Sequence, residues 1–133
     1  MNRTLIVALG LVLLAGCSKK TKEVKLAATA GAAPLSYELR LGKDTYQHYC
    51  MLCHGESGAG DGFNAFNLDP HPRDYSDPAF QKKKTDAELA DAIRRGGAGV
   101  GLSPLMPPWG HTLTDAQINQ VVLYLRTLER KPE

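Results

Sequence analysis

The sequence predicts an all-α fold, and three observations support that prediction. Apolar residues recur at three- and four-residue steps in three segments, which is the spacing of one face of a helix. Two of these segments open with Thr and carry Glu or Gln three positions later, which is the pattern of a capping box. No segment alternates apolar and polar residues in the manner of a half-buried strand.

Composition limits the functions that the chain can have. Its 133 residues are enough for one small domain. The 16 Lys and Arg residues against 14 Asp and Glu residues give a net charge of +2, too even a balance for a dedicated nucleic-acid-binding protein. Three cysteines are too few, and odd in number, for a disulfide-stabilised scaffold.

The N-terminus has the pattern of an export signal. Arg3 precedes an unbroken run of eleven apolar or glycine residues, from Leu5 to Ala15. Such a run is too short to span a bilayer, but it has the length of the hydrophobic region of a secretory signal peptide. We therefore expect residues 1–16 to be a signal peptide and the mature protein to be exported.

The end of this signal, Leu14-Ala15-Gly16-Cys17, resembles the lipobox of bacterial lipoproteins, in which the cysteine becomes the acylated first residue. The resemblance implies that Cys17 is lipidated and anchors the protein to a membrane, facing the periplasm or the cell exterior. Ser18 at the next position favours the outer membrane in a bacterium that has one. The alternative is an ordinary signal peptide with a chance cysteine near its end.

A tether and the first helix come next. Residues 17–36 are rich in Lys and Ala and offer no apolar face to bury, so we expect a flexible, lipidated tether there. The folded domain is expected over residues 37–133. Its first helix is predicted over residues 37–53, with Leu39, Gly42 and Tyr46 on one stripe.

The second and third helices are marked by their capping boxes. Thr85 with Glu88 opens one, and Thr114 with Gln117 opens the other. The glycines at residues 96–97 are expected to end the second helix. The apolar faces are formed by Leu89, Ala92 and Ile93 in the second helix and by Ile118, Val121, Val122, Leu125 and Leu128 in the third.

Two long segments, residues 55–84 and 97–113, are rich in Gly and Pro and have no periodicity of their own. Loops of this length are unusual in a compact domain unless something organises them. Three short helices also supply little core. Both difficulties disappear if the chain wraps around a large apolar cofactor.

The motif Cys50-Met51-Leu52-Cys53-His54 is a CxxCH sequence at the end of the first predicted helix. CxxCH is the attachment motif of c-type haem. Its two thiols add to the two vinyl groups of one haem, and the adjacent imidazole becomes a ligand of the iron. We therefore predict one covalently bound haem c.

Three other sites remain possible for these cysteines. A zinc site would need four ligands, and the sequence has no second paired motif. A thioredoxin-like CxxC would need a βαβ pattern, which is absent from the sequence. A structural disulfide between Cys50 and Cys53 is the third alternative.

Met106 is the candidate for the second axial ligand. Of the three methionines, Met1 belongs to the signal peptide and Met51 lies between the attachment cysteines. Pro107 pushes Met106 toward an extended conformation, and the prolines around it stiffen the loop. A core position for Met106 is the alternative. The other possible sixth ligands are His48, His71 and His111.

Over residues 38–130 the chain resembles the class I c-type cytochromes. Beyond CxxCH, the resemblance rests on Gly42 and Tyr46 in the first helix, where the glycine permits a close crossing with the last helix. The Val122-Leu123-Tyr124-Leu125 stretch and the loops at residues 58–62 and 70–75 add to it. The implied fold has three main helices, with long loops wrapped around one covalently bound haem.

The resemblance also implies the site residues. Cys50 and Cys53 would form the thioether links, with His54 as proximal and Met106 as distal ligand of the iron. A carbonyl near Pro70 or Pro72 would accept the Nδ1 proton of His54. The sequence departs from the family pattern at Phe66, where many members have proline. The candidate partners for the haem propionates are Arg73, Tyr75 and Trp109.

The expected function is that of a membrane-tethered monohaem cytochrome carrying single electrons between respiratory redox proteins, without enzyme activity or a small-molecule substrate. Lys82-Lys83-Lys84 would be a solvated run, or would steer an acidic partner. One alternative is a fixed haem subunit of a respiratory complex. Another is a haem sensor or peroxidase in which Met106 dissociates.

Overall fold

The computed structural model describes residues 36–130. The predicted signal peptide, the lipidation site Cys17 and nearly all of the tether lie outside the described residues. Within residues 36–130 the chain forms helices and no strand, so the predicted all-α class is confirmed. None of the helices in this part of the chain is long and apolar enough to cross a membrane.

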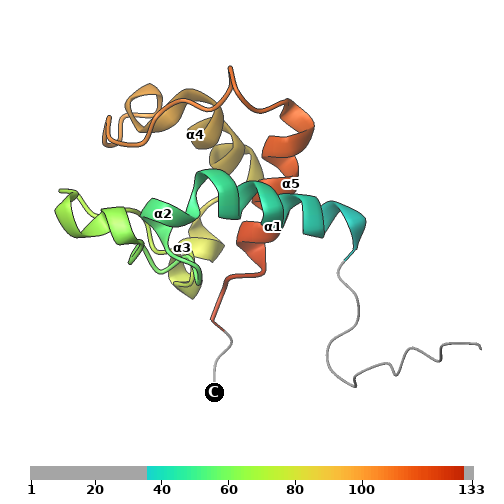
Figure 1. Cartoon of the computed structure of the whole chain (residues 1–133), viewed down its shortest axis with the longest axis horizontal. Helices are drawn as coiled ribbons and strands as arrows, with labels where there is room; N and C mark the ends of the chain where they lie inside the picture. Colours follow the sequence, from blue (N-terminus) through green and yellow to red (C-terminus); the bar gives the residue numbers. More distant parts are fainter. Residues whose placement is uncertain (1–35, 131–133) are drawn as a thin grey trace, which may run out of the picture. The chain divides into compact units, whose positions relative to one another are not determined.

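In the part of the chain that the structure describes, five α-helices and one 3₁₀-helix follow one another (Figure 1). In order they are α1 (Tyr37–Tyr49), α2 (Met51–His54), η1 (Phe63–Asn67), α3 (Pro78–Lys83), α4 (Asp86–Gly99) and α5 (Asp115–Arg126).

Helices α1 and α5 cross closely, with α1 in front of α5 in Figure 1. Gly42 is buried at the crossing, and a Cβ atom there would overlap the carbonyl of Gln120. The ring of Tyr46, one turn further along α1, lies 5.2 Å from the ring of Tyr124 on α5. The close approach predicted for Gly42 is therefore present, because only a residue without a side chain fits between the two backbones.

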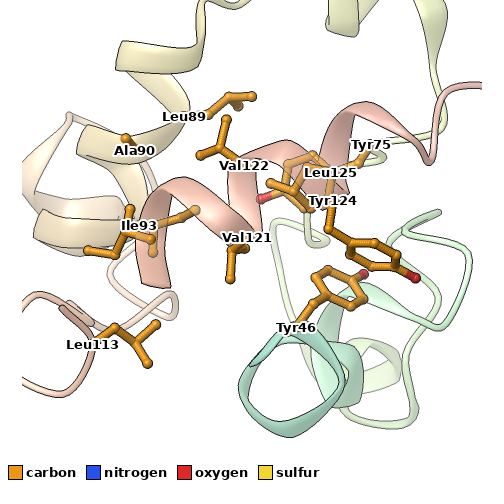
Figure 2. Packing of buried hydrophobic residues seen from close by; sticks show 11 residues of the cluster. Tyr46, Tyr75, Leu89, Ala90, Ile93, Leu113, Val121, Val122, Tyr124 and Leu125 are labelled. Atoms are coloured by element: carbon orange, nitrogen blue, oxygen red, sulfur yellow. The ribbon is translucent and has the colours of Figure 1, made fainter. Parts of the chain in front are cut away.

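The core gathers around α5 (Figure 2). Its Ile118, Val121 and Leu125 are 2% exposed or less, and they belong to one cluster with Leu89 and Ile93 of α4. The apolar faces predicted for these two helices are thus buried. Ala92 and Leu128 are the exceptions, because both are only half-buried. Ala92 lines a cavity described below, and Leu128 lies beyond the end of α5.

Both predicted capping boxes are present. The hydroxyl of Thr85 accepts from the amide of Glu88 at 3.2 Å, and the Glu88 carboxylate accepts from the amide of Thr85 at 2.9 Å. Thr114 and Gln117 exchange the same two hydrogen bonds at the start of α5. These local signals set the N-terminus of each helix.

The predicted helix over residues 37–53 is wrong in one respect, because it is broken at Cys50 into α1 and α2. The Cys50 carbonyl accepts from the amides of both Cys53, at 3.1 Å, and His54, at 2.9 Å, which tightens the chain into a new turn. The segment of residues 55–84 also contains two elements that the periodicity did not predict, η1 and α3.

Candidate functional site

A cavity of about 500 Å³ opens between the helices and is lined mainly by apolar side chains. This volume lies within the range of sites for small molecules and cofactors. The end of α1, part of α4, and the segments around residues 68–75 and 102–109 contribute to its wall. Both segments that lacked periodicity in the sequence therefore line one site.

All seven residues predicted to bind haem line this cavity, namely Cys50, Cys53, His54, Arg73, Tyr75, Met106 and Trp109. Among the three alternative histidine ligands, His71 also lies on the cavity wall. His48 and His111 are exposed and are not part of it.

The break after α1 determines where the two thiols lie. Cys50 and Cys53 are half-buried, and both are free thiols, which excludes the disulfide alternative in this structure. Burial, together with the smaller effect of the neighbouring Cys53, raises the pKa of the Cys50 thiol to about 12. Within residues 36–130, no three His, Cys, Asp or Glu side chains are grouped to hold a metal ion.

His54 is buried, and its ring is oriented by two neighbours. Nδ1 lies 3.3 Å from the carbonyl oxygen of Arg73, and the ring of Tyr75 packs against the imidazole at a centroid distance of 4.8 Å. Burial lowers the pKa of His54, which favours the neutral imidazole. With Nδ1 protonated and donating to Arg73, the lone pair of Nε2 is the one available to a metal.

The acceptor for His54 lies next to one of the two prolines named in the prediction. The expected acceptor was a carbonyl near Pro70 or Pro72, and the structure places the carbonyl of Arg73, the residue after Pro72, at the imidazole. The amide of Tyr75 donates to the Gly58 carbonyl at 2.7 Å, which draws this loop across the turn that follows His54. The structure thus identifies Arg73 as the residue whose carbonyl orients the imidazole.

The loop that carries Met106 is attached to α4 by backbone hydrogen bonds. The amide of Gly97 donates to the Met106 carbonyl at 2.9 Å, and the amide of Trp109 donates to the Ile93 carbonyl at 3.0 Å. Gly96, with φ of 68°, breaks the helical conformation inside α4 as predicted, and a Cβ there would lie 2.6 Å from the nitrogen of Pro108. The absence of a side chain at Gly96 thus lets the loop pack on α4.

The three candidate propionate partners lie in different surroundings. The Arg73 side chain is exposed, and its guanidinium lies 5.2 Å from the centre of the Phe80 ring. Tyr75 is buried, and burial raises the pKa of its phenol. Trp109 is half-buried, with its ring 5.2 Å from that of Tyr49. Each has a polar group able to meet a carboxylate at the cavity, and their role toward the propionates stays a prediction.

One polar group near the site escaped the sequence analysis. The amide of Gln81, a buried residue of α3, donates to the carbonyls of Tyr75, at 2.6 Å, and Leu125, at 2.9 Å. Its side-chain oxygen accepts from Arg126 at 2.7 Å. This network holds the Tyr75 backbone beside His54. Gln81 precedes three lysines, so the sequence around it indicates a solvated run rather than a buried side chain.

The residues of the cavity fit a covalently attached haem. Two thiols, an imidazole with a fixed tautomer and a thioether share the wall of one mainly apolar cavity. Thioether attachment needs the thiols, and an iron of this class is ligated by imidazole and thioether. Polar and charged side chains at the same wall suit carboxylates.

Comparisons with known proteins agree with this chemistry. A family model described as cytochrome c oxidase, cbb3-type, subunit III matches residues 38–125. A solved structure described as KustC0563 c-type cytochrome has a similar fold, with a TM-score of 0.54 and 24% identity over 67% of this chain and 98% of that chain. No curated protein matches at a significant level.

Proposed function

The chain belongs to the family described as cytochrome c oxidase, cbb3-type, subunit III, and from this premise we propose that it is a monohaem cytochrome carrying single electrons between redox proteins. As a c-type cytochrome it is a haem protein with covalently bound haem c. The observation that best supports the finer proposal is that Cys50, Cys53, His54 and Met106 line one cavity.

The proposed roles of these residues follow from their geometry. When bound, haem supplies an iron that takes up and releases one electron at a time. Cys50 and Cys53 would hold it through thioether bonds. His54 would offer Nε2, because its Nδ1 donates to the Arg73 carbonyl. Met106, held by its backbone to α4, would offer its sulfur as the second protein ligand of the iron, which would raise the reduction potential and keep other ligands out.

The first experiment is the visible spectrum of the full chain, produced together with c-haem maturation machinery, in oxidised and reduced states. A denaturing gel stained for haem accompanies it. Covalent haem with the ferric far-red band of sulfur-to-iron ligation is the expected result. A high-spin spectrum would favour a sensor or peroxidase instead, and a chain without haem would contradict the proposal.

The family description gives one reason to keep a second function, that of a fixed haem subunit of a respiratory complex. Attachment to a complex would place the haem permanently beside its redox partner and raise the effective concentration of the two centres. Purification in mild detergent separates the two functions. A free carrier elutes alone, whereas a subunit elutes with an oxidase.

The tether is part of the same proposal. A lipid on Cys17 would hold the protein at a membrane surface of the periplasm or the cell exterior. We expect Cys17→Ser, expressed with its signal peptide, to move the haem-stained protein from the membrane fraction to the soluble fraction. Retention of the variant in the membrane fraction would contradict lipid anchoring at this residue.

A further inference from the structure

Two phenylalanines of η1 are far more exposed than an apolar side chain of their size normally is. Phe63 is 89% exposed and Phe66 is 86% exposed. They stand three residues apart in a 3₁₀-helix, in which residues at that spacing lie above one another on the same side. A pair of large aromatic side chains presented together on a surface marks an interaction site more often than a chance exposure.

The pair extends into a larger apolar surface at the edge of the haem site. A second hollow beside η1 is lined by Phe63, Phe66, Leu105 and the attachment residue Cys53, among others. Leu105, next to Met106, is 51% exposed. We call Phe63, Phe66 and Leu105 the aromatic patch. Because it borders Cys53, a protein bound to this patch would lie close to the haem.

The charged residues on the two segments that form the aromatic patch are all acidic. The segment of residues 51–72, which carries η1, contains Glu56, Asp61 and Asp69 and no Lys or Arg. All three carboxylates are exposed. The segment of residues 96–113, which carries Leu105, contains no Asp, Glu, Lys or Arg. The patch is thus apolar at its centre, with only acidic side chains on the segments that form it.

The acidic charges of these segments distinguish between the possible partners of the aromatic patch. Two copies of the chain docked through the patch would bring carboxylates against carboxylates, which is unfavourable. An acidic redox protein would meet the same repulsion. A partner with an apolar centre surrounded by Lys and Arg would match both the aromatic side chains and the charges.

We propose that the aromatic patch is the docking surface for a redox protein whose own docking face is apolar at its centre and basic at its rim. The proposal rests on the electron-carrying function given above and names the class of partner. A small interface built on two aromatic side chains suits a transient encounter. The carboxylates would increase the rate of encounter without adding much to affinity.

The test measures electron exchange by stopped-flow absorbance between the haem-loaded full chain and two probe proteins. One probe is a basic cytochrome c with lysines around its haem edge, and the other is an acidic plastocyanin. Because the probes differ in potential, each variant is compared with the wild-type chain for the same probe, and the dependence of each rate on salt is measured.

The first variant is Phe63→Ser/Phe66→Ser, and Leu123→Ser, at an apolar residue of α5 that is 45% exposed, is the matched control. We expect the double variant to slow exchange with the basic probe about tenfold, because aromatic residues dominate such interfaces. The control should leave the rate unchanged. Equal rates for the double variant and the wild type would overturn the proposal.

The second variant, Glu56→Gln/Asp69→Asn, removes two of the three acidic side chains of the segment of residues 51–72, which carries η1. Asp44→Asn, at an exposed residue of α1, is its control. With the basic probe we expect the wild-type rate to fall as the salt concentration rises. This dependence on salt should become weaker in Glu56→Gln/Asp69→Asn and stay unchanged in Asp44→Asn. A wild-type rate that falls with salt for the acidic plastocyanin and rises for the basic probe would overturn the proposal.

Two further results distinguish a failure of the docking proposal from a failure of the proposed electron-carrying function. In the first, all variants exchange electrons normally with ascorbate and ferricyanide while the Phe substitutions leave exchange with proteins unchanged. That result would overturn only the proposal that the aromatic patch is a docking surface. Failure of the wild-type haem protein to exchange electrons with these reagents would overturn both. A changed visible spectrum or potential in Phe63→Ser/Phe66→Ser would place these rings against the haem and would also overturn docking.

Discussion

Met106 lies half-buried on the cavity wall, in a loop whose backbone is bound to α4 through Gly97 and Ile93. The backbone position of Met106 is therefore fixed relative to α4. A thioether held in this way is suited to remain on an iron in both oxidation states, which a carrier of single electrons needs. This assignment can be tested with a substitution that changes the sulfur and little else.

We predict that Met106→Leu keeps the covalently bound haem but loses the ferric far-red band and lowers the reduction potential, because leucine has a similar volume and no sulfur. Visible spectroscopy and a redox titration measure the result. Met51→Leu is the matched control, since Met51 lies between the attachment cysteines and is partly buried. Retention of the far-red band in Met106→Leu would show that another residue ligates the iron.

The individual residues of the site were predictable where the chemistry depends on a side chain. Two thiols and an imidazole at fixed spacing, and one methionine left over, identify themselves by residue type. The carbonyl that orients His54 could not be identified by residue type, because every residue carries a carbonyl. Only the path of the loop brings the Arg73 carbonyl to Nδ1. Gln81 was missed for a related reason, since its partners are backbone carbonyls.

At the scale of elements, the start of α4 depends on a charged capping box. Hydrogen bonds from the Lys84 ammonium and from the amide and hydroxyl of Thr85 lower the pKa of Glu88 to about 2. The unfolded chain has the ordinary carboxyl pKa of 4.5, so folding favours the ionised form. The stabilisation is complete above about pH 4.5 and is lost as the pH falls to about 2.

We therefore predict that the stability difference between the wild type and Glu88→Gln is present at pH 6 and shrinks to nothing near pH 2. Glutamine can still accept the hydrogen bond from Thr85 but carries no charge for Lys84. Denaturant unfolding of the haem-loaded protein over this pH range measures the difference. Gln117→Ala is the control at the uncharged box of α5, and its loss of stability should not depend on pH. A difference between the wild type and Glu88→Gln that is constant with pH would contradict the argument.

Helix α3 is held to the rest of the domain through Gln81. We predict that Gln81→Leu lowers the free energy of unfolding by about 2 kcal/mol, because the Tyr75 and Leu125 carbonyls lose their side-chain donor in the interior. Denaturant unfolding measures this loss. Lys82→Leu, at an exposed position of the same helix, is the control and should change stability little. Equal stabilities of the two variants would show that water replaces the lost donor.

Helices α1, α4 and α5 were predictable because their signals are local: caps, periodic apolar faces and a terminating glycine. Helix α3 had a local signal too, in the Asp77 cap followed by Pro78, but its six residues are too few to show a period. The turn η1 shows neither a side-chain cap nor a buried face, since Ala65 is its one buried residue. Such short elements depend on their surroundings more than on their own sequence.

At the scale of the whole molecule, a cavity lies between the segments that form its wall, where packed apolar side chains would otherwise be expected. Much of the wall comes from segments without helix periodicity, and these segments would lack an apolar centre to pack on without a cofactor. We predict that Cys50→Ala/Cys53→Ala, which prevents covalent attachment, gives a chain with reduced helix content and a broad, early thermal transition. Far-ultraviolet circular dichroism measures both quantities against the haem-loaded wild type. A sharp transition at the wild-type temperature would show that the helices form without haem.

Two of the hydrogen bonds that fasten the Met106 loop to α4 join the Gly97 amide with the Met106 carbonyl and the Trp109 amide with the Ile93 carbonyl, and both involve only main-chain atoms. Every amino acid brings a carbonyl, and every one except proline brings an amide. The attachment of the loop is therefore indifferent to the side chain at position 106. A histidine or lysine introduced there would be held by the same backbone hydrogen bonds. The ligand atom at this position can therefore be exchanged without a change in the fold.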